Sequence, residues 1–355
     1  MSYTKSQLAG QALTVLGPIS VDDLGVTLSH EHCLIDITCV FVEPEEATAR
    51  KLAFEPLSFK NAGYIQYHGT ENRDNLLLLD EELALTEILP FKHAGGGTIV
   101  DVTNVDLARD PLALKRISNA TGLNVIMGAG YYVRVGQNLE VMDKRNEEDI
   151  AEEIVRDILE GVGATGVHAG IIGEIGCSWP LEDCERKVLR AAGIAQKETG
   201  APLNIHPGRF EDAPFEIVAI LKEVGADLSH TVMDHMDRTI FDSKKLYKLA
   251  DFGCYLAFDE WGSEGYYPES LSAITDIMND TQRIAYIKDL MLKGYGSQIL
   301  ISHDICAKRR YMAFGGHGYN HILYNAVPAM RRRGLNEEQV NDLLIENPKR
   351  FLAFK

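Results

Sequence analysis

Short apolar, β-branched runs alternate along this chain with segments of helical periodicity. One such segment places Leu83, Ile88 and Phe91 at helical spacing before the second run. Alternation of strands and helices predicts a parallel sheet, because a parallel pair needs a long crossover. The runs lie near residues 26–30, 97–103, 123–130, 169–175, 202–206, 230–235, 255–259 and 298–304.

Eight such units in about 300 residues favour a closed barrel over an open, doubly wound sheet. An open sheet normally carries a glycine-rich phosphate loop after its first strand, and here that place holds His-Glu-His. The glycines at 95–97 precede their strand, which is typical of a turn. We therefore predict an α/β fold, a (β/α)8 TIM barrel with a short N-terminal β extension, in which residues 1–355 form a single domain.

Charge and composition narrow the class of partner. The formal net charge of -17 argues against nucleic acid and anionic membranes as general partners. The chain has no apolar run of about 18 residues and no signal-peptide pattern at its start. Its six cysteines form no CxxC pair, which is typical of reduced thiols. We expect a cytoplasmic protein that acts on a small-molecule substrate, and a homodimer remains open.

Metal-ligating side chains recur where the apolar runs end. A lone histidine at a strand end is usually a hydrogen-bonded core residue, but five strand ends showing the same pattern suggest a shared site. Imidazole and carboxylate groups suit zinc and related divalent ions, and six groups exceed what one tetrahedral ion needs. The pattern predicts a dinuclear metal centre with a bridging carboxylate. The candidate ligands are His30, His32, Glu174, His206, His235 and Asp304.

The barrel geometry separates these residues from the other histidines. Active sites of such barrels lie at the carboxyl ends of the strands, where His206, His235 and Asp304 stand. Strand alternation puts His30 and His32 on one face and turns Glu31 away, as a supporting or outer-face carboxylate. Five other histidines are expected to be structural, turned to the other side of the sheet, or solvated; these are His230, His303, and the loop or helix-end residues His68, His93 and His168.

Several longer motifs resemble one known family. TLSHEH, AGIIGEIG, GHGYNHIL and ENPKRFLAF are similar to the phosphotriesterase family of the amidohydrolase superfamily. GIIGEIGCSWPLEDCERKVLRAA and NIHPGR resemble its phosphotriesterase-related, or resiniferatoxin-binding, branch. The resemblance implies a (β/α)8 barrel with two divalent cations, usually Zn²⁺, although Mn²⁺, Co²⁺ or Fe²⁺ would also serve. It further implies that His30, His32 and Asp304 hold the buried ion, and that His206 and His235 hold the exposed one.

One position departs from the family pattern. Many members end strand four with a lysine that becomes carboxylated and bridges the metals, but this chain has no lysine between Arg156 and Lys187. Glu174 stands there instead, and a glutamate can bridge without carbon dioxide. The departure also weakens the case for phosphotriesterase activity.

The implied reaction is hydrolysis of a carboxylic ester, lactone or amide by a metal-bridging hydroxide, because two ions lower the pKa of a shared water. We expect the substrate to carry an anionic group and to be cleaved ahead of a neutral phosphotriester. Asp304 would take the proton and pass it to the leaving group. Asp237 is either a proton relay or a supporting partner. The alternatives are a phosphoester or phosphotriester hydrolase and, in another class, a non-catalytic ligand-binding barrel.

Substrate contacts are expected from the loops that follow the strands. The seventh of these loops, residues 259–269, is long and aromatic, as a lid or pocket wall should be. Trp179 follows strand four and is another candidate wall residue. Lys308, Arg309 and Arg310 either attract an anionic substrate or form a solvated loop. The predicted substrate-binding residues are Tyr132, Arg209, Trp261 and Arg309.

Overall fold

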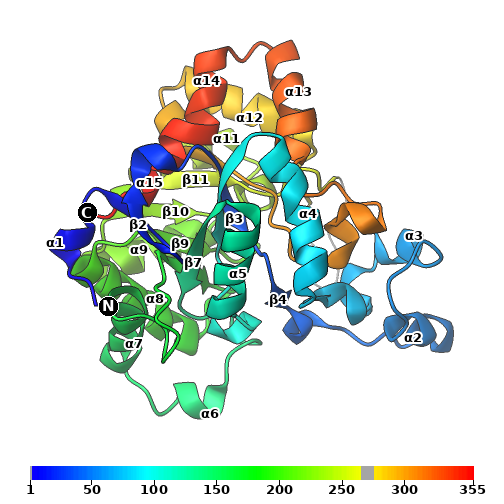
Figure 1. The fold of residues 1–355 in the computed structure, drawn as a ribbon, viewed down its shortest axis with the longest axis horizontal. Coiled ribbons are helices and arrows are strands. Elements are labelled where there is room, and N and C mark those ends of the chain that lie inside the picture. Colours follow the sequence, from blue (N-terminus) through cyan, green and yellow to red (C-terminus); the bar gives the residue numbers. More distant parts are fainter. Residues whose placement is uncertain (1, 265–275) are drawn as a thin grey trace.

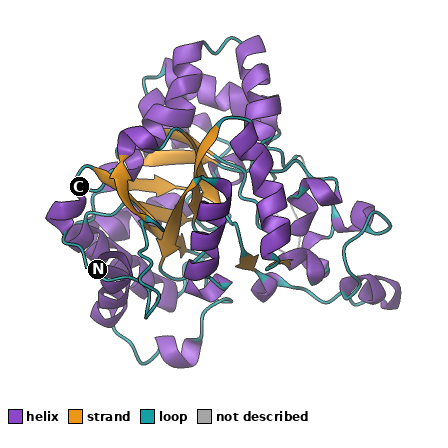
Figure 2. Ribbon diagram, viewed as in Figure 1, coloured by secondary structure: helices purple, strands orange, loops and turns teal. Residues whose placement is uncertain are grey.

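The computed structural model describes residues 2–264 and 276–355, and its centre is a sheet of eight strands (Figures 1 and 2). Neighbouring strands in this sheet pair in parallel. The order around the sheet is β12-β11-β10-β9-β8-β7-β6-β3. The strands are β3 (Val26–Glu31), β6 (Gly96–Asp101), β7 (Asn124–Ala129), β8 (Ile171–Gly176), β9 (Leu203–His206), β10 (Thr231–Met233), β11 (Tyr255–Phe258) and β12 (Ile299–Ile301).

The first and last strands of the sheet meet and close it into a barrel. The amide of Asp304 donates to the carbonyl of His30 over 3.2 Å. The hydroxyl of Ser29 donates to the carbonyl of Ile301, also over 3.2 Å. The predicted (β/α)8 barrel is confirmed.

Helices connect the strands and surround the barrel (Figure 2). The longer connecting helices are α4 (Glu81–His93), α5 (Pro111–Thr121), α7 (Glu147–Leu159), α8 (Asp183–Thr199), α9 (Ala213–Glu223), α11 (Ser243–Ala250) and α12 (Asp280–Leu292), and α13 (Val327–Arg332), α14 (Glu337–Asn341) and α15 (Asn347–Leu352) follow the last strand. The short helices are α1 (Lys5–Leu8), α2 (Ala47–Ala53), α3 (Ala62–Ile65), α6 (Leu139–Met142) and α10 (Met236–Thr239). Among the described residues, no helix is long and apolar enough to span a bilayer.

Consecutive strand residues alternate between two hydrophobic cores, as the pleat of a strand requires. On β12, Ile299 and Ile301 pack in the larger core with the helices, while Leu300 belongs to a smaller core. The smaller core also receives Ala12 and Phe351. Ala12 lies on the predicted N-terminal β extension, a hairpin of β1 (Gln11–Thr14) and β2 (Gly17–Ser20).

A long excursion separates the first barrel strand from α4. Its ends form an antiparallel ribbon of β4 (Ile35–Asp36) and β5 (Leu77–Leu78), and it contains α2 and α3. The excursion extends beside the barrel in Figure 1. The sequence pattern did not predict this ribbon. Of the predicted seventh loop, residues 265–269 lie outside the described part of the chain.

Candidate metal centre

Irregular strand pairing turns two candidate ligands toward the barrel interior. Opposite β6, β3 carries an extra residue between Leu28 and Glu31, where three steps along β3 match two along β6. The pairing of β8 with β9 shifts in the same way between Ile172 and Ile175, on either side of Glu174. Such bulges are over-represented beside active sites because they redirect a side chain.

Two further candidate ligands adopt a strained backbone. His235 has φ 56° and Asp304 has φ 52°, in the left-handed region that residues other than glycine seldom occupy. Each stands just after a strand, at the barrel mouth. Strain of this kind is of order 1–3 kcal/mol per residue and concentrates at functional sites.

The candidate ligands for the buried ion converge on one point. His32 Nε2 lies 3.2 Å from Asp304 Oδ1 and 3.8 Å from Glu174 Oε1. His30 Nε2 lies 3.4 Å from Glu174 Oε2 and 3.7 Å from Asp304 Oδ1. Four ligands arranged tetrahedrally about a zinc ion are about 3.3–3.6 Å apart, given metal–ligand bonds of about 2.0–2.2 Å. These side chains therefore fit a divalent cation.

A second group shares Glu174. His206 Nδ1 lies 2.8 Å from Glu174 Oε2 and 3.0 Å from His235 Nε2. His235 Nε2 lies 3.8 Å from the same carboxylate oxygen. The structure thus brings all six predicted ligands together and places Glu174 between the two groups.

Three supporting side chains orient the imidazole rings, and the sequence reasoning missed them. Asp259 Oδ1 lies 2.8 Å from His235 Nδ1, and Asp234 Oδ2 lies 3.2 Å from His30 Nδ1. The hydroxyl of Thr103 lies 2.8 Å from Nδ1 of His32. Such contacts leave Nε2 of each ring facing the centre. The available signal was that Asp234 and Asp259 also stand at strand ends.

The electrostatics of the cluster favour ionised carboxylates. Burial alone would raise the pKa of Asp304, but its hydrogen bond with His32 and the charge of Arg310 hold the pKa well below the ordinary value. Burial likewise opposes ionisation of Glu174, and His206 outweighs it, so that this pKa is also low. Burial lowers the pKa of His206 to about 4. Burial would lower the pKa of His30, by contrast, but the carboxylates of Asp234 and Asp259 outweigh it and raise that pKa. The hydrogen bond with Asp304 likewise raises the pKa of His32 despite its burial. Metals bind ionised carboxylates and neutral imidazoles, so cations bound in these groups would displace protons from His30 and His32.

Glu31 supports the loop that carries Asp304. Its Oε1 accepts hydrogen bonds from the Ser302 hydroxyl and the His303 amide, at 2.7 and 2.8 Å. The His303 ring, on the opposite side of the strand from Asp304, lies 2.8 Å from the same oxygen. Its Oε2 accepts from the Ile305 amide at 3.0 Å. Of the two roles predicted for Glu31, the geometry favours the supporting one.

Asp237 was predicted to be either a proton relay or a supporting partner of a ligand, but its side chain contacts other residues. Its Oδ2 lies 2.6 Å from Arg283 Nε and accepts a hydrogen bond from the Glu260 amide at 3.0 Å. The side chain is fully buried in this ion pair. These contacts are those of a structural residue and not of a proton relay.

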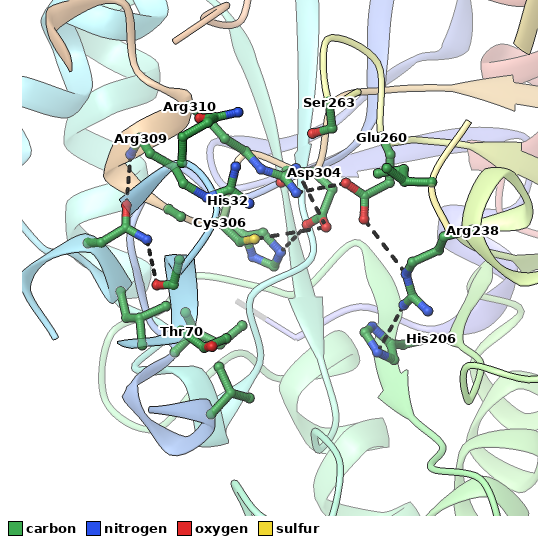
Figure 3. Close-up of a pocket in the computed structure, with 18 of the residues that line it drawn as sticks. His32, Thr70, His206, Arg238, Glu260, Ser263, Asp304, Cys306, Arg309 and Arg310 are labelled. Atoms are coloured by element: carbon green, nitrogen blue, oxygen red, sulfur yellow. Dashed lines mark hydrogen bonds and ion pairs between the residues drawn. The ribbon is translucent and has the colours of Figure 1, made fainter. Parts of the chain in front are cut away.

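A cavity of about 140 Å³ opens onto the candidate centre (Figure 3). Four of the six candidate ligands line it, namely His32, Glu174, His206 and Asp304. Of the predicted substrate-binding residues, Tyr132, Arg209 and Arg309 line it as well. Tyr132 packs edge-on against His206, with ring centroids 5.2 Å apart.

Trp261 lies outside the cavity, so the prediction that it contacts the substrate is wrong. Its side chain is fully buried in the large hydrophobic core and does not line the cavity. The indole packs in this core because the backbone of Trp261 is bonded to the residue after β12: the Trp261 amide donates a hydrogen bond to the Ser302 carbonyl. Trp179 stacks on Phe210 near the surface, also away from the cavity.

The basic cluster of the eighth loop divides into different roles. Lys308 forms an ion pair with Asp74 at 2.6 Å and does not line the cavity. Arg310 is buried, forms an ion pair with Glu260 at 2.7 Å and donates to the carbonyl of His303. Arg309 lines the cavity. The cluster is therefore not a solvated loop.

Arg238 and Glu260 are cavity residues that the sequence reasoning missed. Figure 3 shows Glu260 between the guanidinium groups of Arg238 and Arg310. Arg238 Nη2 also lies 3.3 Å from His206 Nε2. Nothing in the periodicity of the chain marks these contacts, which join separate loops.

Four of the histidines that were predicted to lie outside the site are His230, His168, His93 and His68. His230 is buried at the start of β10, where burial lowers its pKa to about 4, as expected of a structural residue. His168 is buried rather than solvated, because its ring contacts the Ile158 carbonyl at 2.9 Å. His93 is exposed and His68 is partly exposed, as predicted.

Comparison with known proteins assigns the family. The model of the phosphotriesterase family matches residues 10–352. N-acetyltaurine hydrolase of Xenopus tropicalis is 45% identical over 351 residues, covering 99% of this chain and all of that protein. A resiniferatoxin-binding protein from Rhodobacter sphaeroides superimposes with a TM-score of 0.94 at 36% identity, covering 99% and 98% of the two chains. A lactonase from Listeria monocytogenes gives 0.78 at 26% identity, covering 97% and 99%. The chain belongs to the phosphotriesterase family and is a metal-dependent hydrolase.

Proposed function

We propose that this enzyme hydrolyses the amide bond of a small N-acyl amine that carries an acidic group, with N-acetyltaurine as the first substrate to test. The main support for this proposal is the cavity, whose lining places arginine side chains beside the candidate metal centre. The relatives named N-acetyltaurine hydrolase support the same substrate class, because their similarity extends over 99% of this chain.

The charge of the cavity suits an anion. Its described lining holds four arginines and four carboxylates; these are Arg209, Arg238, Arg309 and Arg310, and Glu174, Glu260, Glu264 and Asp304. With divalent cations bound, the lining would therefore be positive overall. Arginine binds a sulfonate or carboxylate through paired hydrogen bonds. The volume of about 140 Å³ suits a small substrate, because pockets for drug-sized ligands are roughly 300–1,000 Å³.

The candidate ligands would hold two divalent ions in the two groups that share Glu174. Bound ions of this kind polarise a carbonyl oxygen and lower the pKa of a water molecule. Asp304 accepts the proton that the attacking water loses, since its carboxylate is ionised beside His32 and Arg310. Water oxygen bonds to the acyl carbon, the carbon–nitrogen bond breaks, and the proton moves to the leaving amine. The second proton of the water also goes to the amine, so the products are a carboxylate and an ammonium group.

Metal content is the first prediction. We expect about two divalent ions per chain after expression in metal-supplemented medium, because five of the six candidate ligands form two groups that share Glu174, and Asp304 Oδ1 lies 3.2 Å from His32 Nε2 of the first group. Elemental analysis of the purified protein measures this directly. A content near zero in a folded protein would remove the basis of the proposed reaction.

The activity itself is tested by incubating the metal-loaded enzyme with N-acetyltaurine and measuring taurine and acetate by mass spectrometry. Matched esters, a lactone and a neutral phosphotriester serve as comparison substrates. We expect the anionic amide to be cleaved with the highest kcat/KM. Faster turnover of the phosphotriester or of neutral substrates would contradict the proposal.

Loss of a cavity arginine should reduce discrimination between anionic and neutral substrates. We expect Arg209→Ala and Arg309→Ala each to lower kcat/KM for N-acetyltaurine by about 10–100-fold, since a charge-assisted hydrogen bond contributes about 1.5–3 kcal/mol. The uncharged analogue N-acetylethanolamine should be affected much less. Arg134→Ala is the control, because Arg134 is an exposed base outside the cavity lining. Equal losses on both substrates would show that the two arginines do not bind the acidic group.

A further inference from the structure

The ribbon of β4 and β5 connects directly to the candidate centre. β4 follows His32, whose ring contacts Thr103, and the Thr103 hydroxyl donates to the carbonyl of Leu34 over 3.2 Å. The ribbon begins with the cross-strand pair Ile35 and Leu78, both buried in the hydrophobic core. Its position is therefore fixed relative to His32.

The next apolar pair along the ribbon reaches the cavity. The amide of Ile37 donates to the carbonyl of Leu76 over 3.1 Å, which continues the antiparallel register. Ile37 and Leu76 both line the cavity, whereas Ile35 and Leu78 do not. Val40 extends the same apolar wall. In Figure 3, Thr70 of this excursion lies across the cavity from Arg238 and His206.

The wall is held in place from its other side as well. Asp74 forms an ion pair with Lys308, and Asn75 Oδ1 accepts a hydrogen bond from the Arg309 amide at 2.9 Å. The Asn75 amide group donates to the Gly69 carbonyl at 2.8 Å. These contacts tie the excursion to the loop after β12, so the apolar wall is held against the same loop that carries the cavity residue Arg309.

We propose that Ile37 and Leu76 form the acyl pocket of the enzyme and restrict the substrate to short acyl chains. The identity of the amine rests on the proposed function, but the pocket would act on any acyl group. An apolar wall beside the centre favours the hydrocarbon part of the substrate, since burying each methylene group is favourable. A longer chain would have to displace side chains that are fixed by the ribbon.

The test compares N-acetyltaurine, N-butanoyltaurine and N-hexanoyltaurine on the metal-loaded enzyme. We expect kcat/KM of the parent protein to fall at least tenfold from acetyl to hexanoyl. Leu76→Ala and Ile37→Ala should each raise the hexanoyl-to-acetyl ratio about tenfold, because each methylene newly accommodated contributes roughly fourfold.

Leu78→Ala is the matched control, since it removes the same atoms from the same ribbon but outside the cavity. We expect it to lower the Tm and to leave the chain-length ratio within about twofold of the parent. If a truncation to alanine prevents folding, Ile37→Val serves as the cavity variant and Ile35→Val as its control outside the cavity. An unchanged ratio in the Ile37 and Leu76 variants, or an equal shift in the control, overturns the proposal.

Binding of the carboxylate products separates this proposal from the choice of amine. Calorimetric titration with acetate, butanoate and hexanoate should show a preference that moves to the longer acids in Leu76→Ala and not in Leu78→Ala. If no acyltaurine is cleaved but this shift appears, the substrate assignment fails and the acyl pocket stands. If acyltaurines are cleaved and neither the kinetic nor the binding preference shifts, the pocket is rejected and the activity stands.

Discussion

Asp304→Asn should lose about 10²–10⁴-fold in kcat, the usual scale for removal of a positioned acid–base group. The amide oxygen of asparagine can still ligate a cation, but it cannot accept a proton. Asp304 meets one requirement of a general base, because its hydrogen bond with His32 and the charge of Arg310 keep its carboxylate ionised and free to accept a proton despite burial. Steady-state kinetics on N-acetyltaurine, or on whichever comparison substrate is cleaved, measures the loss.

Two measurements separate a chemical from a structural effect in this variant. Elemental analysis should show most of the parent metal content, and the Tm should stay close to that of the parent. The Asp304 amide, which bonds to His30 across the barrel closure, is unchanged by the substitution. Near-normal turnover in a metal-loaded Asp304→Asn protein would identify another group as the base.

Glu174→Gln should remove at least one ion per chain and abolish measurable turnover. The carboxylate lies between the two groups of candidate ligands, with Oε2 near His206 and His30 and Oε1 near His32. A neutral amide has only one oxygen and no charge to offer two cations. Added bicarbonate should not restore activity, because no lysine is present in this part of the chain to be carboxylated.

Glu185→Gln provides the matched control for this prediction. Glu185 is also a fully buried glutamate, and it accepts hydrogen bonds from the amides of Arg134 and Ser178 rather than contacting the candidate ligands. We expect this control to lower the Tm while keeping both ions. Full metal content in Glu174→Gln would refute the bridging role.

Periodicity predicted the barrel because its signal is local. Each strand is a short apolar run, and residues such as Leu300 and Ile301 alternate between the two cores as the pleat requires. The barrel rule then predicts which strand ends share the mouth. The grouping of the six candidate ligands follows from these two regularities.

Simple alternation counted from Leu28 would have turned both His30 and His32 away from the barrel interior. Counting from Leu28, which packs in the outer core, places His30 on the outside, and only the extra residue in β3 returns it to the interior. A bulge of this kind leaves no mark in the hydrophobic pattern. The prediction of a His-x-His pair facing the centre depended on chemistry rather than on register.

Contacts between residues that are distant in the chain could not be predicted from the sequence pattern. Arg238, Glu260 and Arg310 come from three loops, and their ion pairs depend on the closed barrel. Trp261 was expected at the pocket because aromatic loops often form walls, but its backbone bond to Ser302 draws it into the core. The ribbon pair Ile37 and Leu76 lies in a segment without helical or strand periodicity long enough to be recognised.

The latch that Glu31 forms with Ser302, His303 and Ile305 has a consequence for biosynthesis. A ribosome makes the first strand more than 250 residues before the last, so the nascent chain carries five of the six candidate ligands while the latch is still unmade. Contacts this distant in sequence form late because their loop-closure cost is high. The metal centre should therefore be completed only after β12 and Asp304 have been synthesised.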